Sequence, residues 1–170
     1  MKKKTASRST TKPLVSIMMG SKSDWPVMKT GADILDEFKI GYEARVLSAH
    51  RTPDDCAAYV KALAGRGVQA VIAGAGSAAH LPGVVASLTT LPVLGVPLAA
   101  TPLAGFDSLM AIVQMPKGIP VATFAVGAPG AGNAALFAVA LLALQDKKIA
   151  GRLDAFRKRQ AKRVLETTLP

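Results

Sequence analysis

The chain is short of the residues on which several kinds of protein depend. It has a single cysteine, Cys56, so no disulfide can form within it, and we expect this residue in an ordinary helix. Aromatic residues make up only 5% of the sequence, whereas 50% of it is hydrophobic. A core of small aliphatic side chains is typical of helices packed on a sheet rather than of two sheets packed around large rings. The composition therefore favours an α/β fold.

Long hydrophobic runs are also missing. A helix that crosses a bilayer takes about 20 apolar residues, and the apolar stretch at residues 133–144 is shorter. No apolar segment near the start resembles a signal peptide, so we expect a cytoplasmic protein that does not act at a membrane. Residues 133–144 are nevertheless apolar on nearly every face, and one domain has little with which to cover them. We expect another subunit to cover this helix; a well-packed core helix is the alternative.

Acidic residues are absent from the first thirteen positions, which hold five Lys or Arg. A second basic stretch at residues 147–163 holds eight Lys or Arg and one acid, Asp154. The middle of the chain is nearly balanced, so the net charge of +10 comes from the two ends. Residues 1–13 show no apolar periodicity and no aromatic side chain that could stack on a base. We therefore expect a disordered basic tail there rather than a nucleic-acid interface.

Apolar runs alternate with helical patterns along the chain. Strands are expected at residues 14–19, 42–48, 69–74, 92–96 and 120–126, and helices at 25–38, 54–67, from about His80, and at 132–147. Alternating units of this length indicate a parallel sheet covered on both faces. We predict a single-domain α/β fold, a flavodoxin-like three-layer αβα sandwich, over residues 14–150. A basic helix at 151–170 is expected to pack on this core or on a neighbouring subunit.

In open α/β sheets, ligands bind beyond the carboxyl ends of the strands, so functional residues are expected in the turns there. The first of these turns, GSKSD, contains Ser21, Ser23 and Asp24. Its glycine permits close approach to the backbone, and hydroxyls at a helix start suit a phosphate. The Asp24 carboxylate can accept hydrogen bonds from a ribose diol. The alternative is that Ser23 or Asp24 only caps the following helix.

The second turn, SAHRTP, places His50 and Arg51 side by side where a strand ends. Arg51 can donate two hydrogen bonds to phosphate oxygens, while Thr52 or Asp54 can cap the next helix. An imidazole exchanges protons near neutral pH, as general acid and base catalysis requires. His50 is therefore the candidate catalytic residue, although a lone histidine more often has a structural role.

The third turn, GAGSAAHLPG, formally matches the glycine pattern of dinucleotide-binding folds. It follows the third strand rather than the first, and no acidic residue lies about twenty positions further on. Its small residues instead allow a planar ligand to lie against the backbone. On the pattern alone, His80 is a structural or ring-facing residue at a helix start rather than a second catalyst. No spacing typical of a zinc site occurs, so we expect chemistry without a metal.

These three motifs, together with FDSLMAIVQMPKGIPVATFAVG and GAGNAALFA, occur in one order and spacing within residues 14–150. Together they resemble the class I PurE family, the 5-(carboxyamino)imidazole ribonucleotide mutases of purine biosynthesis. The resemblance implies a homo-octamer that moves a carboxylate of a small nucleotide from an exocyclic nitrogen to ring carbon 4. It also implies that no ATP, metal or organic cofactor takes part. Functional coupling to the ATP-dependent enzyme that makes the carbamate substrate is a further expectation.

The resemblance also implies roles for individual residues. Ser21, Ser23 and Arg51 would hold the 5′-phosphate, and Asp24 the ribose hydroxyls. His50 matches the family's proton shuttle. The residues implied to border the base and the carboxylate are Ser48, Ala49, Gly76, His80 and Leu81.

Some positions depart from the family pattern. Ser77 stands where a glycine is usual, Ala99 and Ala100 stand where a polar residue and a serine are usual, and Pro129 is uncommon before the long helix. Ser77 can narrow the carboxylate pocket, and the alanines can alter a neighbouring loop. Two alternative functions stay open. One is a class II carboxylase, which uses free carbon dioxide and usually carries lysine where Arg51 stands; the other is a non-catalytic nucleotide- or RNA-binding module.

Overall fold

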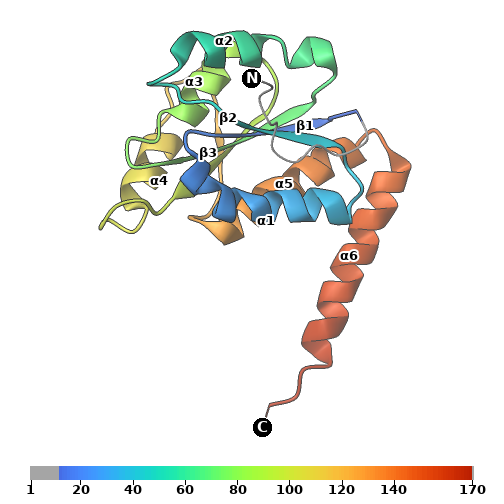
Figure 1. Cartoon of the computed structure of the whole chain (residues 1–170). Helices are drawn as coiled ribbons and strands as arrows, with labels where there is room; N and C mark the ends of the chain where they lie inside the picture. The colour runs from blue at the N-terminus through green and yellow to red at the C-terminus, as the bar shows by residue number, and fades with distance from the viewer. Residues whose placement is uncertain (1–11, 170) are drawn as a thin grey trace.

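The structure is a computed structural model that describes residues 12–169, so nearly all of the basic tail expected at residues 1–13 lies outside the described residues. Strands and helices alternate along the chain (Figure 1). The strands are β1 (Val15–Met19), β2 (Tyr42–Val46), β3 (Ala70–Gly76), β4 (Val93–Leu98) and β5 (Ala122–Thr123). The helices are α1 (Trp25–Glu37), α2 (Pro53–Lys61), α3 (Leu81–Leu88), α4 (Phe106–Val113), α5 (Ala128–Ala143) and α6 (Lys147–Leu165), with short 3-10 helices η1 (Lys22–Asp24) and η2 (Ala64–Arg66).

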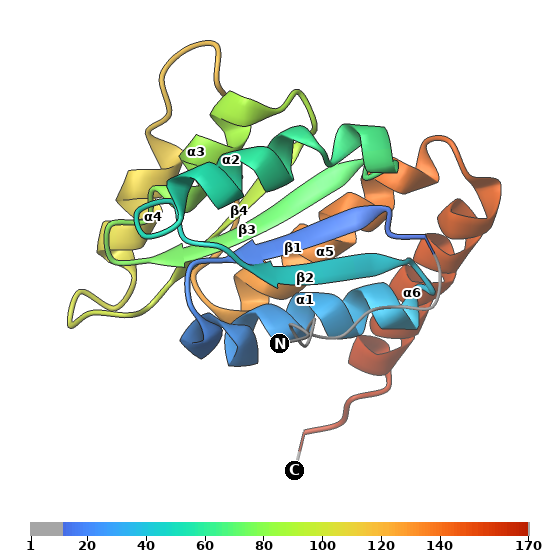
Figure 2. The ribbon, with the colours of Figure 1, turned by 45° about the horizontal axis from the view of Figure 1, so that its top comes forward.

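The five strands form one parallel sheet in the order β2-β1-β3-β4-β5. This is the flavodoxin-like order, in which the chain reverses its direction of growth between β1 and β3. Helices α1 and α5 cover one face of the sheet, and α2 and α3 cover the other (Figure 2). The predicted three-layer αβα sandwich is confirmed.

The side chains of β1 point alternately to the two faces of the sheet, and a separate hydrophobic core lies on each face. Val15, Ile17 and Met19 are fully buried in the core shared with α1 and α5, whereas Met18 belongs to the core under α2 and α3. Successive side chains of a strand point to opposite faces, so a strand covered on both sides is apolar at nearly every position. The exception in β1 is Ser16, which is buried and forms a hydrogen bond with the Tyr59 hydroxyl. The run LVSIMM is therefore a central strand.

Several element boundaries differ from the sequence prediction; the helix expected at 54–67, for example, is divided into α2 and η2. The long helix runs over Ala128–Ala143 rather than 132–147, because Pro129 fits the first turn of a helix, where no backbone amide is required. A new helix, α6, then begins at Lys147, because the Asp146 side chain accepts hydrogen bonds from the amides of Lys148 and Ile149. The basic helix expected at 151–170 therefore begins before residue 151.

The fifth strand is also shorter than predicted. Only Ala122 and Thr123 pair with β4, whereas a strand was expected over 120–126. Pro120 has no amide to donate, and after Phe124 the chain turns through Gly127, whose φ is +78°. The edge strand thus ends at Thr123, and the turn through Gly127 leads into α5 at Ala128.

Helix α6 packs on the domain only along its first half. Ile149 is buried, the Phe156 ring lies 5.4 Å from that of Phe38, and Arg159 pairs with Glu37 at 2.7 Å. Beyond this point the helix extends away from the domain (Figure 1). No helix within residues 12–169 has both the length and the apolar character that a membrane span needs.

Candidate active site

A pocket of about 350 Å³ lies beyond the carboxyl ends of β1, β2 and β3, where the site was expected. Nine of the ten predicted site residues line it: Ser21, Ser23, Asp24, Ser48, Ala49, His50, Arg51, Gly76 and Leu81. The tenth, His80, contacts one of them. Its other lining residues are Gly20, Ala75, Ser77, Ala78 and Ala100. The topology brings the three turns together because the strands that precede them are parallel neighbours.

The first turn is held by its own side chains. The Ser21 hydroxyl accepts hydrogen bonds from the Ser23 amide and hydroxyl, while an Asp24 carboxylate oxygen accepts one from the Ser21 amide at 2.9 Å. These contacts form a capping box at the start of η1. Ser21 is therefore the side-chain cap, at the start of η1, and Asp24 is its reciprocal partner. Asp24 also occupies the capping position of α1, but its side chain bonds to no amide of that helix. The turn holds its two hydroxyls and its carboxylate at fixed positions along the pocket.

The second turn is joined to the first by Arg51. Its guanidinium donates to the Gly20 carbonyl at 2.7 Å and to the Ser48 hydroxyl at 3.3 Å. Thr52 occupies the capping position of α2, but its hydroxyl bonds to the backbone of Ser48 instead of to a helix amide. The cap expected from Thr52 is therefore not formed. Its hydroxyl instead closes the turn that carries His50.

His50 and His80 form a direct contact that the sequence analysis did not foresee. Nε2 of His50 lies 2.8 Å from Nδ1 of His80, and the two rings meet edge to face at 83°. One nitrogen must donate and the other accept, so the tautomer of each ring fixes the hydrogen-bonding role of the other. His50 comes from the β2–α2 loop and His80 stands just before α3. The two histidines are 30 positions apart in the sequence, so no local sequence pattern indicates this contact.

The third turn is tightly packed against the loop after β4. A Cβ atom at Gly76 would lie 2.7 Å from the Ala100 Cβ and 3.1 Å from the Leu98 carbonyl oxygen, so no side chain fits there. The next residue, Ser77, adopts a positive φ of 55°. Ser77 and Ala100, two departures from the family pattern, thus line the same end of the pocket.

The helices contribute to the electrostatics of the pocket. Helices α1, α2 and α3 each begin just after one of the three turns, so their amino ends lie at this edge of the sheet. The amino end of a helix carries a partial positive charge and unpaired amide groups that favour an anion. Together with Arg51, these amino ends suit the pocket to an anionic ligand.

Comparison with known proteins gives matches over most of the chain. A family model described as AIR carboxylase matches residues 14–163. The N5-carboxyaminoimidazole ribonucleotide mutase of Vibrio parahaemolyticus is 53% identical over 156 residues, which cover 92% of this chain and 97% of that protein. The Bacillus subtilis protein of the same name is 52% identical, with 92% and 96% covered. The crystal structure of Treponema denticola PurE superposes with a TM-score of 0.81 at 30% identity, covering 91% of this chain and 95% of that one.

Proposed function

The chain belongs to the AIR carboxylase family, and on that basis we propose a mechanism for it as an N5-carboxyaminoimidazole ribonucleotide mutase of purine biosynthesis. The activity rests on relatives of that name with more than half of their residues identical to this chain over nearly its whole length. The substrate is accordingly a small nucleotide. The observation that supports the mechanism is the pocket, because it unites three turns that are far apart in sequence.

The phosphate of the nucleotide binds at the β1 and β2 side of the pocket. Ser21 and Ser23 donate from the first turn, and Arg51 donates from the second. The amino end of α1 adds its partial positive charge. Asp24 accepts hydrogen bonds from the ribose hydroxyls. Anchoring the sugar phosphate in this way presents the aminoimidazole ring to His50.

His50 transfers one proton in each half of the reaction. As a general acid it protonates the carbamate nitrogen, the N–C bond breaks, and carbon dioxide and aminoimidazole ribonucleotide remain in the pocket. Carbon 4 of the electron-rich ring then attacks the same carbon dioxide. His50, now a base, removes the proton from carbon 4 and aromaticity returns. Ala49 and Leu81 provide apolar walls that retain carbon dioxide and exclude water.

The quaternary structure we propose is the homo-octamer implied by the family. A groove of about 530 Å³ between α5 and α6 supports association, since it is lined by Phe124, Leu136, Phe137, Leu153 and Phe156 together with polar residues. Phe137 is 44% exposed in the single chain. A cytoplasmic location and functional coupling to the ATP-dependent enzyme that makes the carbamate substrate belong to the same proposal.

A two-substrate assay tests the function. Purified protein is given either N5-carboxyaminoimidazole ribonucleotide without added bicarbonate, or aminoimidazole ribonucleotide with bicarbonate. We expect efficient turnover of the first. Efficient turnover of only the second would identify a class II carboxylase, and nucleotide binding without turnover of either would identify a binding module. The relatives' names and Arg51 favour the mutase over both alternatives.

The His50→Asn variant tests the mechanism. We expect it to lose nearly all turnover, because an amide cannot exchange protons near neutral pH, while it still binds the nucleotide through Ser21, Ser23 and Arg51. Calorimetric titration with the nucleotide provides the control for folding and binding. Turnover close to that of the wild type would exclude His50 as the proton carrier.

A further inference from the structure

Ser77 has an unfavourable backbone conformation and an unused hydroxyl. Its φ of 55° lies in the left-handed region, where a residue other than glycine is uncommon and disfavoured. Within residues 12–169 the Ser77 hydroxyl has no hydrogen-bond partner, so no contact there compensates for this conformation. Strained residues of this kind concentrate at ligand sites, where the strain belongs to the function. Ser77 is exposed and lines the pocket described above.

The strand order places Ser77 at the opposite side of the pocket from the phosphate. The loops after β2 and β1 carry Arg51 and Ser21, and β3, which ends at Gly76, follows β1 in the sheet. Neighbouring strands lie about 4.8 Å apart, so a nucleotide anchored by its phosphate at the first two loops extends its base toward the third. His50 also points in this direction, as its bond to His80 shows.

The other described residues that line the pocket beside Ser77 have no side-chain donor, and His80, which lies near them, is engaged with His50 through its Nδ1. Ala75, Ala78 and Ala100 have only methyl side chains, and Gly76 has none. Ser77 and Ala100 both line the pocket, and the Ala100 methyl packs against Gly76, the residue before Ser77. Ser77 is therefore the one side-chain hydroxyl on the β3 and β4 side among the described lining residues.

We propose that Ser77 is a substrate-contacting residue whose hydroxyl donates a hydrogen bond to the carboxylate that the enzyme transfers. The inference rests on the proposed function for the identity of that carboxylate. A hydrogen bond to a charged group is stronger than one between neutral groups, and it compensates for the backbone strain only when the ligand is bound. Ser77 thereby distinguishes carboxylated nucleotides from the bare aminoimidazole ribonucleotide.

Paired binding measurements on the Ser77→Ala variant test this assignment. The ligands are aminoimidazole ribonucleotide, which lacks the carboxylate, and 4-carboxy-5-aminoimidazole ribonucleotide, which carries it. We expect Ser77→Ala to weaken binding of the carboxylated ligand roughly tenfold or more, as loss of a hydrogen bond to a charged group does. Binding of the bare nucleotide should be unchanged, because its phosphate and ribose contacts remain.

Two further variants separate the hydroxyl from the backbone. Ser77→Gly removes both the hydroxyl and the strain, so it should raise the thermal midpoint and still lose affinity for the carboxylated ligand. Adding Ala100→Ser to Ser77→Gly should restore part of that affinity from the adjacent loop. Equal affinity of wild type and Ser77→Ala for the carboxylated ligand would overturn the proposal.

These binding measurements do not require turnover. A wild-type protein that binds both nucleotides but converts neither would contradict the proposed function, while the comparison of Ser77 variants would still decide the hydrogen bond. Conversely, normal mutase activity with unchanged carboxylate affinity in Ser77→Ala would leave the function intact and exclude this role for Ser77.

Discussion

His80 is placed to control the proton of His50, since the two ring nitrogens lie 2.8 Å apart. Substituting His80→Phe keeps a ring but removes the partner nitrogen, so the tautomer and orientation of His50 lose their constraint. We expect kcat to fall about tenfold, with little change in KM; the loss is smaller than the roughly 100- to 10,000-fold contribution of a general acid or base, because His50 itself remains. Steady-state kinetics on the variant give kcat and KM separately and so test this expectation.

A conservative variant distinguishes control of the proton from simple packing. In His80→Asn the amide keeps a donor and an acceptor near the position of Nδ1, so part of kcat should return. Nitrogen NMR of His50 should show a fixed tautomer in the wild type and in His80→Asn, and a mixture in His80→Phe. A wild-type kcat in His80→Phe would show that the contact is not used in catalysis.

Arg51 has a structural bond to the Gly20 carbonyl in addition to its predicted phosphate contact. Arg51→Ala should raise the Kd for the nucleotide by about tenfold to a hundredfold, as loss of a charged hydrogen bond does, and leave the rate of the bound complex nearly unchanged. Single-turnover kinetics and calorimetry measure the two effects separately. An unchanged Kd with a slower chemical step would show that the phosphate lies elsewhere.

At the scale of single residues, the sequence predicted membership of the pocket but not the contacts made there. The ends of apolar strands predicted the three turns, and with them Ser21, Ser23, Asp24, His50 and Arg51, which all line the pocket. Ser48, Ala49, Gly76 and Leu81, which also line it, were implied by the family resemblance instead. The hydrogen bond between His50 and His80 and the bond from Arg51 to Gly20 depend on strand order. No local pattern encodes such long-range contacts.

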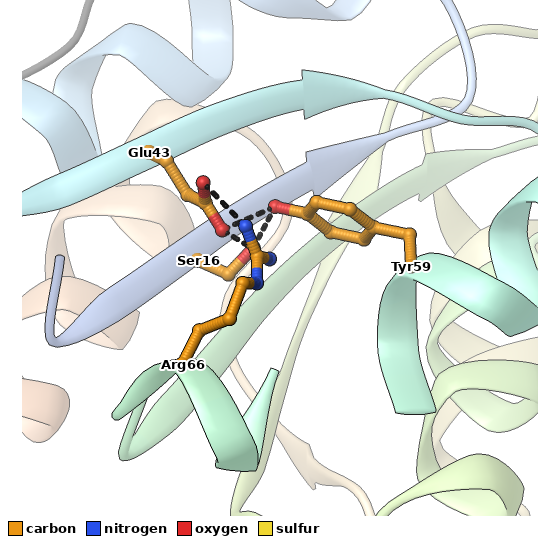
Figure 3. Close-up of polar contacts among 4 residues, drawn as sticks. All are labelled: Ser16, Glu43, Tyr59 and Arg66. Carbon is orange, nitrogen blue, oxygen red and sulfur yellow. Dashed lines mark hydrogen bonds and ion pairs between the residues drawn. The ribbon is translucent and has the colours of Figure 1, made fainter. Parts of the chain in front are cut away.

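At the scale of elements, a partly buried polar cluster joins α2 and η2 to the sheet beneath them (Figure 3). The Tyr59 hydroxyl lies 2.8 Å from the Ser16 hydroxyl and donates to a Glu43 carboxylate oxygen at 2.8 Å. Arg66 donates to both oxygens of the same carboxylate and lies over the Tyr59 ring. Burial, as the main cause, raises the pKa of Tyr59 to about 12. The cluster fixes the helix whose first turn follows His50 and Arg51.

The raised pKa of Tyr59 makes stability depend on pH in the alkaline range. The hydroxyl is neutral in both states below its unfolded pKa of about 10, so its full contribution is present there. Between pH 10 and 12 the unfolded chain loses the proton more readily than the folded one, so the free energy of unfolding should decrease as pH rises. Denaturant titrations at pH 8, 10 and 11 measure the free energy of unfolding. It should decrease less between pH 8 and pH 11 in Tyr59→Phe than in the wild type, because the variant has no hydroxyl to lose a proton.

At pH 8 the same variant should be less stable than the wild type by about 1–3 kcal/mol, because Ser16 and Glu43 lose a partner in a partly buried site. A variant with the wild-type pH profile between 10 and 11 would show that another group causes the alkaline loss. The comparison of the two proteins at each pH removes the contribution of the lysines, which both contain.

The sequence predicted the elements better than their ends. Strong apolar runs such as that of β1 follow from burial on two faces, which leaves few alternatives. The break between α5 and α6 depends instead on one side chain, Asp146, which caps a new helix within a continuous helical pattern. Strand β5 is short because it lies at the sheet edge, and hydrophobicity alone does not encode where such pairing ends.

At the scale of the whole molecule, one surface of the single chain exposes several large apolar side chains. The groove between α5 and α6 is bordered by the rings of Phe124 and Phe137, which contact each other at 5.6 Å. Leu144 at the end of α5 is 81% exposed. Contiguous exposed apolar surface of this kind is typical of an interaction site. A helix that is apolar on nearly every face, as α5 is, needs a second cover.

Phe137→Glu tests whether copies of this chain provide that cover. The wild type should have a light-scattering mass near eight times 17.5 kDa, about 140 kDa. A carboxylate at this position would have to lose its water in the assembly, and Arg157 is the only cation among the described residues that line the groove, so the variant should shift to smaller species. Ala58→Glu, an equal change of charge at an exposed position of α2 in the opposite layer, should keep the wild-type mass. An unchanged mass in Phe137→Glu would place the subunit contacts on another surface.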